Sequence, residues 1–196
     1  PGATAPASRA AVAPDGPRAA ETPAAAARPP SALPQTVALT RPTALEEIRL
    51  AQDFFTTAQL PNARLVVTDK PAALASFTAV WRSDNAAGAV KIIPPGPDVS
   101  GIGIASDLIA VDPRMCQGNF ATARSSATID RSVVFSVMLS CTEADEQRSA
   151  QYFITPRRQG GFVVFAVVGS SAAGGFDQQR LDLLTRAAVR AAQNDG

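Results

Sequence analysis

Four runs of apolar or alternating side chains follow one another in the second half of the chain, and short polar segments separate them. The runs cover residues 120–129, 133–142, 151–156 and 162–169. The segments "IDRS" and "PRRQGG" between them are typical of turns that join neighbouring antiparallel strands. The sequence therefore predicts an antiparallel β-meander.

A helix is expected before this meander, over residues 44–58, because Thr43 and Glu46 have the spacing of a capping box. Its expected buried face consists of Leu45, Ile48, Ala51, Gln52 and Phe55, and its expected solvent face of Glu46, Glu47, Arg49 and Asp53. A second helix is expected after the meander, over residues 178–193. Asp177 is its predicted cap, and Leu181, Leu184 and Ala188 are its predicted inward residues.

The middle of the chain has weaker patterns. "ARLVVT" at residues 63–68 and "AGAVKIIPP" at 87–95 are predicted strands. "DKPAALASFTAVWRSD" at 69–84 is predicted to be a helix, because Leu74, Phe77 and Trp81 have helical spacing. "GIGIASDLIAVDP" from residue 101 is predicted to be a further strand or a bent pair of strands.

Together these elements predict an α+β fold, in which N-terminal and C-terminal α-helices pack on an antiparallel β-sheet as a layered sandwich. Across residues 43–193 the order of elements resembles the PsbP-like and DcrB-like sandwiches of exported proteins. The resemblance concerns architecture alone and implies no site residue.

The first 35 residues differ from the rest in composition. They contain half of the 16 prolines and almost no large apolar side chain, so they cannot bury enough surface to offset the entropy of ordering. We expect a disordered Pro/Ala-rich arm over residues 1–35 and a single α+β domain over 40–196. The arm is interpreted as a spacer, with a solvated tail as the alternative.

Cys116 and Cys141 are the only two cysteines. A hairpin closed around Asp130 and Arg131 places Phe120 opposite Cys141 and Cys116 just beyond the strand, which is close enough for a disulfide. Two free buried thiols are the first alternative. Redox or metal chemistry is the weaker one, because the chain has no histidine and no CxxC spacing. A disulfide indicates an oxidising compartment, so a periplasmic or secreted location is expected.

Several classes of function are disfavoured by composition. The absence of histidine removes the Ser-His-Asp and Cys-His systems. Ser-Lys chemistry at Lys70 or Lys91 has no serine at a supporting spacing. Two sets of carboxylates could serve glycosidic or metal chemistry, but loop solvation is the preferred interpretation. They are Asp107 with Asp112, and Glu143, Asp145 and Glu146. A formal net charge of +1 without charged blocks argues against nucleic-acid partners. We expect no catalytic residue, no metal and no cofactor.

Two surface sites remain as candidates. Arg157 and Arg158 in the "PRRQGG" turn, together with Trp81, are candidate partner-binding residues. The alternatives are a solvated turn for the arginine pair and, for Trp81, a core position that closes the helix expected at 69–84 onto the sheet. A weaker candidate for anion binding lies in "GSSAAGGFD" before the last helix. Its residues are Ser170, Ser171, Gly174 and Gly175.

The expected function is that of a non-catalytic extracytoplasmic module of the bacterial envelope, tethered by the Pro/Ala arm and acting through protein–protein contacts. The alternative is a carrier of a small apolar ligand or lipid in an apolar groove, and an enzyme that uses carboxylates is the third hypothesis. No apolar run is long enough to span a bilayer. The start at Pro1, without Met, suggests that an upstream piece has been removed, which is a signal peptide, a membrane anchor or a segment trimmed for expression.

Overall fold

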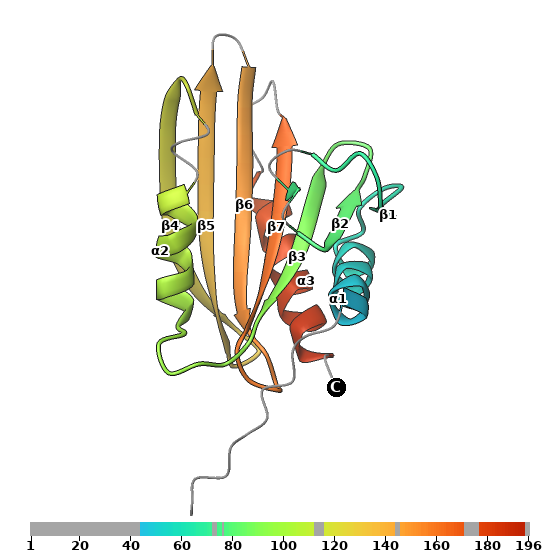
Figure 1. Ribbon diagram of the computed structural model, residues 1–196, viewed down its shortest axis with the longest axis vertical. Coiled ribbons are helices and arrows are strands. Elements are labelled where there is room, and N and C mark those ends of the chain that lie inside the picture. Colours follow the sequence, from blue (N-terminus) through green and yellow to red (C-terminus); the bar gives the residue numbers. More distant parts are fainter. Residues whose placement is uncertain are drawn as a thin grey trace, which may run out of the picture. The chain divides into compact units, whose positions relative to one another are not determined.

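The computed structural model describes residues 44–71, 74–75, 77–111, 116–143, 146–170 and 177–194. These residues belong to one compact unit, and the expected arm lies outside them. Within this unit the α+β prediction is confirmed: three helices and a seven-stranded antiparallel sheet are present, with the helices packed on the sheet (Figure 1).

The sheet has the order β1-β2-β3-β7-β6-β5-β4. Its strands are β1 (Arg64–Val66), β2 (Ala79–Arg82), β3 (Ala87–Ile93), β4 (Asn119–Ile129), β5 (Ser132–Glu143), β6 (Glu146–Pro156) and β7 (Phe162–Ser170). The last four strands form the predicted meander, since each pairs antiparallel with the next. Because β7 also pairs antiparallel with β3, the meander extends the β1–β3 sheet, and β1 and β4 become the two edges.

The helices cover the two faces of the sheet unequally. α1 (Ala44–Thr57) and α3 (Gln178–Gln193) pack against each other on one face, and their core includes Phe54, Phe165 and Leu184. α2 (Gly101–Val111) packs on β5 and β6 from the other face, where Ile104 and Val137 belong to a second core. Figure 1 shows α2 on the near side of the sheet, with α3 passing behind it.

The buried face of α1 differs from the predicted one by a rotation of about one residue. The buried residues are Glu47, Leu50, Ala51 and Phe54, while Leu45 is 76% exposed. Phe54 stacks on Phe165 with ring centroids 4.8 Å apart, which sets the rotation. Glu47 was wrongly expected in solvent: its Oε1 accepts a hydrogen bond from Ile92 N–H at 3.0 Å, beyond the end of β2.

The helix predicted over residues 69–84 is wrong. Around Leu74 the chain makes only a turn, in which Leu74 N–H donates to Pro71 O and Phe77 N–H donates to Leu74 O. The following residues form β2, where Trp81 pairs with Gly88 of β3. A Cβ on Gly88 would lie 2.1 Å from the Trp81 ring, so this glycine makes room for the indole in the sheet. Packing of Trp81 against the α1 core overrides the helical spacing.

The strand predicted from residue 101 is also wrong, because this segment is α2. Ser100 begins the helix: its Oγ accepts from Gly103 N–H at 3.1 Å and its carbonyl accepts from Ile104 N–H. A Cβ on Gly101 would lie 2.4 Å from the Phe135 ring, so the glycine allows the helix to start directly on the sheet. The apolar residues have helical spacing, and Ile104 and Ala105 are buried.

The predicted C-terminal helix and its cap are confirmed. Asp177 Oδ1 accepts from Arg180 N–H at 2.7 Å, and α3 begins at the next residue, Gln178. Leu184 and Ala188 are fully buried, as expected. Within the described residues, no helix is both long enough and apolar enough to cross a membrane.

Candidate binding surface

The predicted disulfide joins Cys116 to Cys141, with an S–S distance of 2.05 Å and Cα atoms 5.7 Å apart. The register that led to this prediction is also confirmed, since Ile129 pairs with Ser132 and Phe120 with Cys141. Gly118 allows the chain to turn towards β5, because a Cβ there would lie 2.0 Å from the Thr142 carbonyl oxygen. The disulfide thus fixes the start of β4 to the end of β5.

Glu143 organises the same end of the sheet. One of its carboxylate oxygens accepts from Gln117 N–H at 2.9 Å, and the other binds Arg148 at 2.8 Å. Glu143 also lies beside both disulfide sulfurs. Because these sulfurs are bonded to each other and are not thiolates, they leave a single carboxylate, which is too few ligands for a metal ion.

β4 is the edge strand next to this disulfide. It pairs with β5 through eleven consecutive residue pairs without a bulge, from Asn119 to Ile129. Residues 121–128 are all exposed. Its side chains between Phe120 and Ile129 are small, apart from Arg124, and the strand contains no proline. A long, flat edge of this kind is the type to which another strand can add.

The direction of the free backbone groups follows from the turn. Asp130 and Arg131 both have positive φ, 48° and 66°, as a two-residue type I′ turn requires. The flanking residues, Ile129 and Ser132, therefore exchange both backbone hydrogen bonds, and bonded pairs then alternate along the ladder. As a result, the even-numbered residues from 120 to 128 direct their N–H and C=O groups away from β5.

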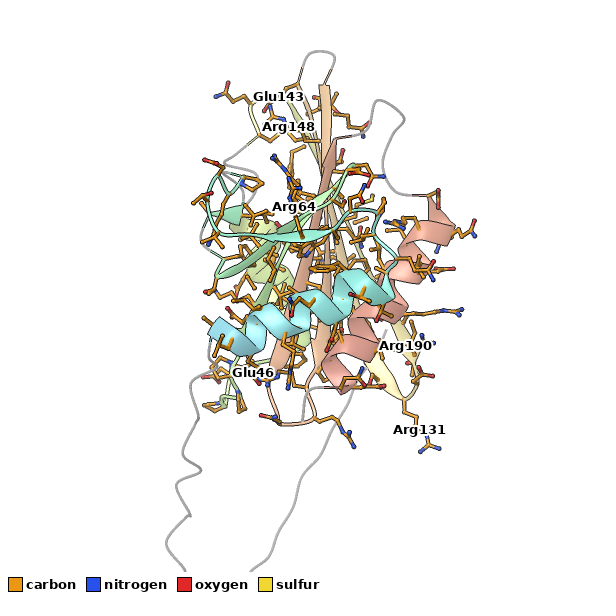
Figure 2. All side chains as sticks on the ribbon, turned by 90° about the vertical axis from the view of Figure 1, so that its right-hand side faces the viewer. Glu46, Arg64, Arg131, Glu143, Arg148 and Arg190 are labelled. Carbon is orange, nitrogen blue, oxygen red and sulfur yellow. A yellow bond between two sulfur atoms is a disulfide. The ribbon has the colours of Figure 1, made fainter. Side chains whose placement is uncertain are left out.

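A groove of about 670 Å³ lies between α3 and the β4–β6 part of the sheet. Its floor includes Ser125, Ser136 and Gln151, which lie on three successive strands. The α3 wall includes Arg186 and Arg190. Figure 2 places Arg190 on the same side of the molecule as Arg131 of the β4–β5 turn. The groove is therefore polar at the floor and along the helix.

Two features of this groove have unused bonding capacity. The Gln151 side chain is 4% exposed, and its Oε1 has no hydrogen-bond partner among the described residues. Arg186 and Arg190 are exposed and form no ion pair within the described part of the chain. In contrast, Asp182 of the same wall already accepts a hydrogen bond from Gln178 Nε2 at 2.8 Å. The groove thus offers two cationic groups and one buried acceptor, beside the carboxylates of Asp130 and Asp182, which also line it.

The two arginines of the predicted pair differ in their surroundings. Arg157 forms an ion pair with Glu46 of α1, and its side chain is only 6% exposed. Arg158 is exposed, as predicted for both residues. Gly160 and Gly161, with φ of 90° and 75°, shape the turn that holds them. Arg157 therefore attaches the turn to α1, whereas Arg158 keeps the exposure that a contact with a partner requires.

Trp81 is fully buried in the core beneath α1. Its ring lies 6.0 Å from that of Phe54 between centroids, and its Nε1 has no partner among the described residues. The helix that Trp81 was expected to close onto the sheet is a strand. Trp81 is thus a core residue and offers no surface to a partner.

Most of the weak anion site, namely Ser171, Gly174 and Gly175, lies outside the described residues, and Ser170 is the last residue of β7. The cap carboxylate of Asp177 already accepts the Arg180 N–H at the start of α3. Asp112 also lies outside the described residues.

The two lysines and Asp107 are not brought together. Lys70 Nζ donates to Phe77 O at 2.8 Å and so supports the loop before β2. Lys91 is exposed on β3, and Asp107 is exposed on α2. These positions do not form a Ser-Lys or paired-carboxylate arrangement.

The edge of β4 and the groove were both missed by the sequence reasoning. The edge had a signal: a strand of small and polar residues between Phe120 and Ile129 cannot be buried on either face. The groove had none, since its α3 wall lies at least 25 positions after the strands of its floor in the sequence.

Comparisons with known proteins give no family. No protein-family model matches the chain, and no curated protein matches it. Among solved structures, it is similar to PA94 from Pseudomonas aeruginosa, a protein of unknown function described as a candidate regulator. That similarity has a TM-score of 0.35 at 9% identity and covers 57% of this chain and 69% of PA94.

Proposed function

We propose that this protein is a non-catalytic extracytoplasmic binding module of the bacterial envelope that takes up an extended segment of a partner polypeptide along the free edge of β4. The partner segment becomes an eighth strand of the sheet. Main-chain hydrogen bonds provide affinity in this mode of recognition, and alternate side chains provide specificity.

The observation that carries the proposal is the uninterrupted, exposed edge of β4. Soluble proteins protect long edges with bulges, prolines, inward-pointing charges or a covering segment, because an open edge otherwise pairs with other chains. β4 has neither a bulge nor a proline along its length, and its one charged residue, Arg124, is exposed. An edge left in this state is best explained by a strand that binds there.

The Cys116–Cys141 bond supports the extracytoplasmic part of the proposal, because disulfides persist in oxidising compartments. It also supports the binding role. The bond holds one end of the β4–β5 hairpin and the two-residue turn holds the other, so β4 is ordered before the partner arrives. Preorganisation of this kind lowers the entropic cost of binding.

The proposal is tested by selecting ligands from a display library of random twelve-residue peptides, with the oxidised full-length chain as the target. Selected peptides are expected to lose binding to the Ser126→Pro variant, because Ser126 directs its N–H outwards and proline has none. The control is Ser106→Ala, a change at an exposed position of α2 that leaves β4 unaltered. A failure to select peptides, or binding that survives Ser126→Pro, would contradict strand addition at β4.

A further inference from the structure

We propose that the segment bound by β4 is acidic and carries carboxylate side chains at positions i and i+2 that bind Arg186 and Arg190 of α3. This inference rests on the proposed function and specifies the chemistry of the partner. It is carried by the groove beside β4 and by the spacing of its two arginines.

A strand added to β4 would direct half of its side chains towards the α3 face of the sheet. Alternate side chains of a strand lie on opposite faces of its sheet. On the α3 face, the residues of β4 that an added strand would lie beside are small: Ala123, Ser125 and Ala127. Ser125 and Ala127 line the groove. Half of the partner's side chains would therefore reach over β4 into this groove.

α3 and β4 end at the same place in the fold. The C-terminal end of α3 is fastened to the β4–β5 turn, since Gln193 Nε2 donates to Ser132 Oγ at 3.2 Å and contacts Asp130 O at 3.5 Å. β4 ends at the same turn, so α3 and β4 both run towards it (Figure 1). Arg186 and Arg190 thus lie on the part of α3 that approaches the end of the edge strand, and both line the groove beside it.

The two arginines of α3 have nearly the same spacing as alternate residues of a strand. Arg186 and Arg190 are four residues apart on a helix, which corresponds to a rise of about 6 Å. Residues i and i+2 of a strand are separated by about 6.6–6.8 Å and point to the same face. Two carboxylates on one face of the added strand therefore have about the same backbone spacing as the two arginines, and the opposite charge.

The floor of the groove carries polar groups that need hydrogen-bond partners. Gln151, 4% exposed and directed into the groove, leaves its Oε1 acceptor without a partner among the described residues. An apolar occupant would leave this acceptor unpaired and would bury the neighbouring hydroxyls of Ser125 and Ser136, at a cost of about 1–3 kcal/mol for each polar group left without a bond. This acceptor needs an N–H or O–H donor, which a lipid chain lacks, so the floor favours a polar segment over a lipid. The carboxylates of the segment bind the arginines and not this acceptor.

On the opposite face, the edge presents Arg124, which points away from α3 because it pairs with Val137 of the second core. An acidic residue of the partner at an intervening position would meet this guanidinium. A second copy of the chain is a poorer occupant, because a symmetric β4–β4 pairing centred on the strand would place Arg124 opposite its own copy.

The experiment compares peptides selected on two targets from the same random twelve-residue library: the full-length oxidised protein and its Arg186→Glu/Arg190→Glu variant. Peptides from the first target are expected to carry Asp or Glu at i and i+2, and peptides from the second to carry Lys or Arg there. Both residues are exposed, so the variant is expected to fold, and the less drastic Arg186→Gln/Arg190→Gln variant provides a second test.

Affinity is then measured by fluorescence anisotropy with the best peptide from the first target. The double glutamine variant is expected to weaken binding by about tenfold, as loss of charge-assisted hydrogen bonds implies, and added salt is expected to weaken it further. Arg82→Gln, an exposed change on β2, is the matched control and is expected to have no effect.

The outcomes separate this inference from the proposed function. Peptides that need the β4 edge but show no acidic bias, and whose affinity is unchanged by the glutamine variant, would overturn the acidic assignment and leave strand addition intact. If no peptide needs the β4 edge, both the inference and the proposed function are wrong.

Discussion

The two edges of the sheet are built in opposite ways. β1 is three residues long, and α1 packs against it, so little of its backbone is offered to another chain. β4 is eleven residues long and exposed along residues 121–128. A short edge strand is one of the ordinary protections against unwanted pairing. Among the described residues, the β4 edge has the single charge of Arg124 as its protection of this kind. The difference teaches that the openness belongs to one side of the sheet and is not a general property of this fold.

We refer to the β1 side of the sheet as the closed side and to the β4 side as the open side. The largest expected effect on stability lies on the closed side. Trp81→Ala removes a fully buried indole from β2, beneath α1, and is expected to lower the free energy of unfolding by about 3–5 kcal/mol. The neighbouring Arg82 is exposed, so Arg82→Ala is the matched control and is expected to change stability by less than about 0.5 kcal/mol. Urea denaturation measures both values. Equal losses in the two variants would show that β2 is not the buried anchor of the closed side.

The disulfide is the main covalent support of the open side. Replacing both Cys116 and Cys141 by serine is expected to cost about 3 kcal/mol, because the bond closes a loop across a sequence separation of 25 residues. Amide exchange should accelerate first at the start of β4, near the lost bond.

The control for this change is gentle reduction of the native protein, which is expected to lower the melting temperature in the same direction. If thiol titration of the unfolded, non-reduced protein found two free thiols, the disulfide and the extracytoplasmic proposal would both fail.

A pair of proline substitutions separates the inner and outer sides of β4. Ser125 directs its N–H towards β5, so Ser125→Pro removes a ladder hydrogen bond and is expected to cost about 3 kcal/mol. Ser126 directs its N–H outwards, so Ser126→Pro is expected to cost about 1 kcal/mol or less while abolishing strand addition. Chemical denaturation and peptide binding measure the two effects. A reversed order of stabilities would mean that the assignment of outward groups is shifted by one residue.

The smallest effect is expected at the turn that ends β4. Arg131 has a φ of 66°, a conformation that is unfavourable for a residue with a side chain, whereas glycine adopts it freely. Arg131→Gly is therefore expected to stabilise the protein by about 0.5 kcal/mol, after allowance for the greater freedom of glycine in the unfolded chain. Arg158→Gly in the β6–β7 turn, where no positive φ is required of that residue, should not stabilise. A loss of stability in Arg131→Gly would contradict the I′ assignment.

The hairpin register could be predicted from sequence because it depends on local information. Asp130 and Arg131 are polar residues between two runs of apolar or alternating side chains, and counting outwards from them placed Phe120 opposite Cys141, as the structure does. The cap of α3 was predictable for the same reason, since Asp177 acts on a backbone N–H three residues away.

Errors arose where distant contacts decide the outcome. Glu47 was expected in solvent because its bonding partner, Ile92 N–H, lies 45 residues away and becomes available only where β2 ends. Trp81 has helical spacing with Phe77 and Leu74, yet its packing beneath α1 and the space left by Gly88 favour a strand. The groove depends on the approach of α3 to β4, which no local pattern records.

The most direct test of the open edge is residue-by-residue amide hydrogen exchange of β4 in the free, oxidised protein. The account predicts an alternating pattern: amides of the odd-numbered residues from 121 to 127 are protected by β5, and amides of the even-numbered residues from 120 to 128 exchange rapidly. A selected peptide should then slow exchange at the even-numbered residues alone. Slow exchange at Thr122, Arg124 and Ser126 in the free monomer would show that another segment already covers the edge, and would contradict the account.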